Sequence, residues 1–226
     1  MASGLCGVES STVTQDAIPD LSDSFAQDVC RILTMPTASR SESETFLDQV
    51  QPGSLLNHTS ASAETMTLPS LWWNRDSIPL TLGRHRLVDA WVAYTIQDSG
   101  VQVVDVTINS QFWRALTMPQ RYGVLTTFGS SAQEFGYHLR FFQSNGYSAR
   151  MIGVFSCEST TNHTAALSAD PRAYCLVTVD APRITQLRRA LQPQPTIQSA
   201  SASEPMPSTE AAVTLSATEN AASTQP

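Results

Sequence analysis

The chain has 226 residues, an apolar content of 41% and a formal net charge of −7. No stretch approaches the ~18 consecutive apolar residues that mark a membrane-spanning helix, and the first 20 residues lack the basic and apolar segments of a secretory signal. These features exclude an integral membrane helix and predict a cytoplasmic protein. The charge is uneven, because residues 68–191 carry eleven Arg and eight acids, whereas both ends of the chain are acidic.

The two ends of the chain are predicted to be disordered tails, at residues 1–20 and 192–226. They are rich in Ser, Thr, Ala and Pro and have too few large apolar residues to offset the entropy of folding. Residues 21–52 predict a helical hairpin whose first helix begins at Ser22 and ends at Pro36. The hairpin is too small to be stable alone, so it either docks on the next domain or stays separate. Residues 53–66 are predicted to be a linker.

Residues 67–191 are predicted to form the folded domain. The periodicity of apolar residues and the positions of Gly and Pro predict helices at 67–78, 84–97, 110–117, 119–135 and 181–191, and strands at 101–108, 137–143, 149–157 and 173–179. Asn145-Gly146 is a strong signal for a hairpin between the second and third strands. This order predicts an α+β fold with a sheet of about four strands, mainly antiparallel, and with helices packed on one face.

Two adjacent tryptophans in "LPSLWW" are the first candidate site. On a helix, Trp72 and Trp73 point about 100° apart. Trp72 continues the stripe of Leu68, so it is expected in the core, while Trp73 lies at the edge of that core. Either both rings are core, or Trp73 acts with Arg75 as an anchor for a protein partner, since Trp and Arg are enriched among interface hot spots.

Arg140, Phe142 and Arg150 are an alternative site, for RNA. In a hairpin that turns at Asn145-Gly146, Arg140 lies opposite Arg150 or one position away. Aromatic and Arg side chains on one sheet face resemble a platform for single-stranded RNA. The characteristic RNP1 motif is absent, and a charge of +3 over residues 68–191 is small for an RNA-binding domain.

Catalytic and metal-binding motifs are absent from the sequence. There is no nucleophile elbow, phosphate-binding loop or paired Cys/His spacing, so we expect neither a metal nor a cofactor, and an enzyme of unrecognised type is the third interpretation. The "RHR" segment at Arg84, His85 and Arg86 is either a solvated helix start or an anion site. Asp105 interrupts an apolar strand and is expected to pair with an Arg.

The four cysteines lack the CxxC spacing of redox and zinc motifs. Cys157 ends one predicted strand and Cys175 begins the next, so they are either a redox pair or two separate small apolar residues. Free thiols are expected throughout, because disulfides are rare in a reducing compartment.

Four segments between residues 67 and 157, "LPSLWW", "VDVTIN..FW", "RYGVLTTFG" and "GYHLRFF", resemble a family of uncharacterised cyanobacterial proteins. The resemblance implies a cytoplasmic setting or a peripheral association with the thylakoid membrane, and it implies no activity and no site. The residues and the resemblance together predict a non-enzymatic interaction or assembly factor with a protein partner. RNA binding is the alternative.

Overall fold

The computed structural model describes residues 22–37, 43–59, 71–144, 149–158, 174–179 and 181–191. The predicted tails at 1–20 and 192–226 lie outside these residues, as does the second half of the predicted linker at 53–66. No helix among the described residues is long and apolar enough to cross a membrane.

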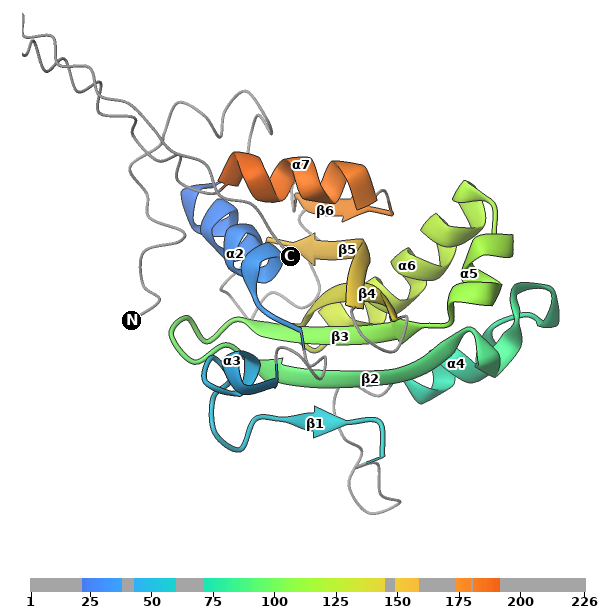
Figure 1. The fold of residues 1–226 in the computed structure, drawn as a ribbon, viewed down its shortest axis with the longest axis horizontal. Helices are drawn as coiled ribbons and strands as arrows, with labels where there is room; N and C mark the ends of the chain where they lie inside the picture. Colours follow the sequence, from blue (N-terminus) through green and yellow to red (C-terminus); the bar gives the residue numbers. More distant parts are fainter. Residues whose placement is uncertain are drawn as a thin grey trace, which may run out of the picture. The chain divides into compact units, whose positions relative to one another are not determined.

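One sheet runs through the described part of the chain, with its strands in the order β1-β2-β3-β4-β5-β6 (Figure 1). Neighbouring strands are antiparallel, except that β3 and β4 are parallel. The strands are β1 (Leu56–Asn57), β2 (Val88–Thr95), β3 (Gln102–Ile108), β4 (His138–Ser144), β5 (Ala149–Cys157) and β6 (Cys175–Thr178). The α+β class is confirmed, but within the described ranges the sheet is mixed and has six strands rather than about four.

Strand β2 corrects the predicted helix at residues 84–97. Leu87, Trp91 and Tyr94 have the spacing of one helix face, but in the structure Trp91 and Tyr94 belong to different core clusters. Both faces of β2 are covered, so its sequence reads as a nearly continuous apolar run instead of the alternation of a half-exposed strand. Pairing with β3, which places Trp91 opposite Val106, overrides the apparent helical periodicity.

Helices pack on both faces of the sheet, which corrects the expectation of a single covered face. The α6-side core joins the helical residues Trp113, Leu125 and Phe128 to Trp91, Val104, Val106, Leu139 and Phe141 of the sheet. The α2-side core joins Phe25, Ile32, Phe46 and Ile184 to Tyr94, Val103 and Val154. The helices are α2 (Asp23–Thr34), α3 (Ser43–Leu47), α4 (Trp72–Ser77), α5 (Ser110–Ala115), α6 (Met118–Gln133) and α7 (Ala181–Leu191), with 3₁₀ turns η1 (Leu80–Leu82) and η2 (Arg84–Arg86).

The N-terminal helices α2 and α3 are part of the sheet's core, which settles a point that the sequence left open. The Phe25 N–H donates to the Ser22 side chain at 3.3 Å, as expected for a helix cap. Phe25 and Ile32 are buried, and the ring of Phe46 meets that of Tyr94 edge to face at 4.9 Å. Residues 22–37 and 43–50 therefore contribute to the same hydrophobic layer as the strands.

The crossover from β3 to β4 places α5 and α6 on the other face. Asn109 caps α5 by accepting from the Gln111 N–H at 3.1 Å, and the Thr117 N–H donates to Gln120 Oε1 at 2.8 Å at the start of α6. A parallel pair of strands needs such a helical connection. Gly129 lets α6 approach β5 closely, because an added Cβ would lie 2.2 Å from the Phe155 ring.

Candidate interaction surface

Helix α4 carries the two tryptophans and Arg75. It spans Trp72–Ser77 and is shorter than the predicted helix at 67–78; the expected cap, Thr67, lies outside the described residues. Leu71, directly before α4, is completely buried in the α6-side core. This anchor holds one side of the short helix against the sheet and leaves the other side outside.

Trp72 and Trp73 have different environments. The Trp72 ring packs against the α6-side core and meets the Trp91 ring edge to face at 4.8 Å. Trp73 is 75% exposed. Arg75 stays with Trp72, since its guanidinium carbon lies 4.2 Å from the centroid of that ring, and it also pairs with Asp76 at 3.3 Å. The predicted asymmetry of burial is therefore present, but Arg75 accompanies the inner tryptophan.

This difference in burial predicts a difference in stability between the alanine variants of the two residues. We expect Trp72→Ala to lower the free energy of unfolding by about 2–3 kcal/mol, because it removes a large, partly buried ring that packs against the α6-side core. We expect Trp73→Ala to change it by about 0.5 kcal/mol, as for an ordinary exposed site. Urea unfolding of the full chain measures both values, and equal large losses would contradict the structural assignment.

A pocket of about 220 Å³ lies between α4 and α6. One wall is formed by α4, η1 and their connection, and the other by the exposed side of α6. The pocket is lined, among others, by Asn74, Ile78, Leu82, Gly123, Val124 and Thr127. The Asn74 Nδ2 atom is buried and has no hydrogen-bond partner in the described part of the chain. The pocket is thus mainly apolar, with one amide donor still available beside it.

The turn that follows α4 presents the "RHR" segment on the surface. Gly83 has φ 99°, and a Cβ there would lie 2.7 Å from the Phe112 side chain, so glycine is needed at this corner. Arg84 has φ 50°, a conformation that is uncommon for residues other than glycine. The predicted helix start is a 3₁₀ turn, and all three residues of η2 are exposed. Strong backbone constraints therefore fix the position of a small cationic surface.

The side chains of Arg84, His85 and Arg86 make no ion pair or hydrogen bond with any described residue. Helix α4 lies beside η2, and Leu80 in η1 is 77% exposed. We call the exposed large apolar and cationic residues of α4, η1 and η2 the α4–η2 surface: Trp73, Leu80, Arg84, His85 and Arg86. The sequence pointed to Trp73 and to the "RHR" segment separately, but nothing in it signalled the pocket, which depends on how α4 packs near α6.

The face proposed for RNA is covered in the structure, which corrects that alternative. Arg140 is completely buried and Phe142 is 4% exposed, with the guanidinium carbon 4.9 Å from the Phe142 ring centroid. Arg150 is exposed, but it lies opposite Gln143, whereas Arg140 lies opposite Val154. The three residues therefore do not form one open platform.

Arg140 instead forms a buried polar network. Its Nε and Nη2 atoms donate to the two carboxylate oxygens of Asp105, both at 2.6 Å, and Nη2 also donates to the Tyr94 hydroxyl at 2.5 Å. Its Nη1 atom donates to the carbonyls of Ile32 and Met35 at 2.8 and 2.7 Å. The expected pairing of Asp105 with an Arg is confirmed, and the same guanidinium ties the end of α2 to the sheet.

Burial and mutual attraction act in opposite directions within this network. Burial raises the pKa of the Asp105 carboxyl, and the Arg140 guanidinium opposes that rise. Burial acts to lower the pKa of Arg140, but the Asp105 carboxylate and Tyr94 outweigh it, and the net pKa is raised. Short bonds from two guanidinium nitrogens to both carboxylate oxygens favour the ionised pair. The network is a stabilising element whose groups are already paired with one another.

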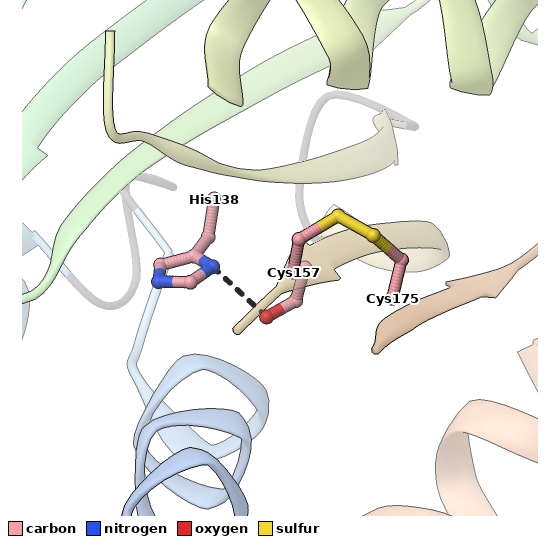
Figure 2. Close-up of a disulfide and its surroundings, with 4 residues drawn as sticks. His138, Cys157 and Cys175 are labelled. Atoms are coloured by element: carbon pink, nitrogen blue, oxygen red, sulfur yellow. Dashed lines mark hydrogen bonds between the residues drawn. A yellow bond between two sulfur atoms is a disulfide. The ribbon is translucent and has the colours of Figure 1, made fainter. Parts of the chain in front are cut away.

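Cys157 and Cys175 form a disulfide, which overturns the expectation of free thiols (Figure 2). They face each other on β5 and β6 with Cα atoms 4.0 Å apart. The Glu158 N–H donates to the Tyr174 carbonyl at 2.9 Å, so the next pair along the strands is the hydrogen-bonded one. The cysteines therefore occupy a non-hydrogen-bonded pair, where antiparallel strands approach most closely.

His138 lies near this disulfide in Figure 2 and makes a buried contact of its own. Its Nδ1 atom is 2.9 Å from the Ser156 Oγ, and Ser156 is completely buried. Burial lowers the pKa of His138 to about 4. The two side chains therefore satisfy each other's hydrogen bonding inside the sheet layer.

Within the described ranges, no group of three His, Cys, Asp or Glu residues is placed to hold a metal ion. Comparisons with protein-family models, curated proteins and solved structures found no match to this chain.

Proposed function

We propose that this protein is an interaction or assembly factor that binds another protein through the α4–η2 surface. The observation that carries the proposal is Trp73, a large aromatic side chain that is 75% exposed on a short helix whose other side is anchored in the core. Burying such a ring against a partner releases a large apolar area from water. Arg84 and Arg86 add cationic groups without an ion pair to a described residue, on the neighbouring turn η2.

The buried polar groups of the sheet are hydrogen-bonded to one another, which favours an interaction surface over catalysis in the sheet; His138 is bonded to Ser156. Asp105, Arg140 and Tyr94 are bonded to one another inside the α2-side layer, and their geometry accounts for the shifts in their pKa values. The exposed Trp73 has no such structural explanation, because its side chain contributes little to the core. An interaction surface would give this exposed ring a role, since Trp is enriched among interface hot spots.

Affinity purification of the tagged full chain tests the proposal. The resemblance makes a cyanobacterial lysate the first source of partners. We expect a protein partner that survives nuclease treatment and whose recovery falls about 30-fold with Trp73→Ala, which corresponds to the ~2 kcal/mol of an interface hot spot.

Tyr122→Ala is the matched control, since Tyr122 is 48% exposed on α6 and does not line the pocket. That variant should retain the partner. Loss of every partner on nuclease treatment would favour RNA instead, and equal recovery with wild type and Trp73→Ala would remove the α4–η2 surface from the interaction.

A further inference from the structure

We infer that the α4–η2 surface takes an acidic segment of a partner protein, with one large apolar side chain in the α4–α6 pocket and carboxylates at Arg84 and Arg86. This inference rests on the proposed function and names the chemistry of the partner. It follows from the charge of the surface, the shape of the pocket and the rigidity of the turn between them.

The charge of the surface is not compensated within the described chain. Arg140 is paired with Asp105, Arg75 with Asp76 and Arg31 with Asp28. Arg84 and Arg86 are exposed and make no comparable contact with a described residue. A guanidinium offers five N–H donors in a planar fork that matches a carboxylate. An acidic ligand would therefore satisfy groups that the fold itself leaves to solvent.

The pocket accounts for the large apolar side chain that we infer in the ligand. Its volume of about 220 Å³ is below the ~300–1,000 Å³ of pockets for drug-sized molecules and suits a side chain. Ile78, Leu82 and Val124 make apolar walls, and the buried Nδ2 of Asn74 can donate to a peptide carbonyl. Leu82 lies two residues before Arg84, so the pocket and the cationic turn adjoin one another along the chain.

These features favour a peptide over other anionic ligands. RNA and anionic lipid also attract Arg, but the whole chain has a net charge of −7, which opposes the long-range approach of a polyanion. A short acidic segment needs only local complementarity. A pocket with an apolar wall and an amide donor fits a side chain next to a peptide carbonyl, whereas a lipid surface needs no such pocket.

The turn that carries the two arginines is held in place before any ligand binds. Gly83 packs against Phe112, and Arg84 keeps φ 50°. A residue held in such a sparsely populated conformation costs free energy, and cases of this kind concentrate at ligand-binding sites. A preformed turn also lowers the entropy lost on binding.

Selection from a displayed library of random 12-residue peptides on the immobilised full chain tests the inference. The library is first depleted on the Arg84→Gln/Arg86→Gln variant. We expect the enriched peptides to share Asp or Glu residues next to one large apolar residue. Absence of enrichment, or enrichment without acidic residues, would overturn the inference.

Fluorescence anisotropy with a labelled selected peptide then measures how much the two arginines and Trp73 each contribute to the affinity. We expect Arg84→Gln/Arg86→Gln and Trp73→Ala each to weaken binding at least tenfold, and binding to weaken with added salt. Arg188→Gln/Arg189→Gln removes the same charge from exposed positions on α7 and should leave affinity within twofold. Equal weakening by both double variants would reduce the effect to net charge and contradict the site.

Two further outcomes distinguish this inference from the proposed function. If the purified partner depends on Trp73 but selected peptides carry no acidic residues, the inference fails and the proposed function stands. If Trp73→Ala changes neither experiment, both fail. Binding of polyuridine or phosphatidylglycerol vesicles, but not of acidic peptides, with loss on Arg84→Gln/Arg86→Gln, would assign the cationic turn to RNA or lipid and overturn the peptide assignment.

Discussion

Asp105→Asn should lower the free energy of unfolding by about 3–5 kcal/mol, because removing one partner of a buried ion pair leaves the other charge uncompensated. The guanidinium of Arg140 is completely buried between the sheet and the end of α2, so without the Asp105 carboxylate its charge would have no counterion. Urea unfolding of the full chain at neutral pH, followed by tryptophan fluorescence, measures the change.

Two matched variants make this prediction specific. Asp89→Asn removes an exposed carboxylate from β2 and should change stability by less than about 0.5 kcal/mol. Asp105→Leu combined with Arg140→Met should recover much of the loss, because an apolar replacement of a buried pair is often neutral or stabilising. A cost below about 1 kcal/mol for Asp105→Asn would mean that the pair does not hold α2 to the sheet.

Cys157→Ser combined with Cys175→Ser should cost about 3 kcal/mol, since the disulfide joins residues that are 18 apart in sequence and cross-links of this length restrict the unfolded chain by about that amount. The loss should fall on the edge of the sheet, because β6 pairs with β5 alone among the described strands. Urea unfolding of both proteins, with and without a dithiol reductant, measures it. If the reductant also lowers the free energy of unfolding of the double variant, that part of its effect does not come from the Cys157–Cys175 bond.

Peptide mapping tests the bond itself. Trypsin cuts at Arg150, Arg172 and Arg183, so Cys157 and Cys175 fall in different peptides. We expect these peptides to be linked in unreduced protein and to separate on reduction. Unlinked peptides would show that the two thiols are free, as the sequence predicted.

The result of the peptide mapping bears on the compartment in which the protein resides. A stable disulfide is typical of oxidising compartments, whereas the composition predicted a cytoplasmic chain. Peptide mapping of protein isolated from its natural host would show whether Cys157 and Cys175 are oxidised in that compartment.

The disulfide lies on the α6-side face of the sheet, since Cys157 belongs to that core, whereas the Arg140 network lies in the α2-side layer. The two variants should therefore act nearly independently on stability.

The sequence by itself determined the elements whose signals are local. Strand β5 (Ala149–Cys157) and helix α7 (Ala181–Leu191) have the predicted bounds, and β3 and β4 differ from prediction by a residue or so. Their β-branched runs, caps and turn residues act over a few neighbouring positions. The 100° offset on one helix also predicted that Trp72 and Trp73 would be buried unequally.

Only the tertiary structure decided the features that depend on residues far apart in the chain. Strand β2 has a helical spacing of large residues, and its pairing with β3 overrides it. The alternation of side chains along a strand predicted that Arg140 and Phe142 share one face of the sheet, and the two side chains are in contact. The packing of α2 covers that face, so Arg140 is part of a buried network. Likewise the register of β5 with β6 joins Cys157 to Cys175, and the approach of α4 to α6 forms the pocket. A local pattern shows which side chains share a face, but it does not show whether another element covers that face. The local signals of this chain therefore predict its elements, whereas burial and the pocket depend on contacts between residues that are far apart in sequence.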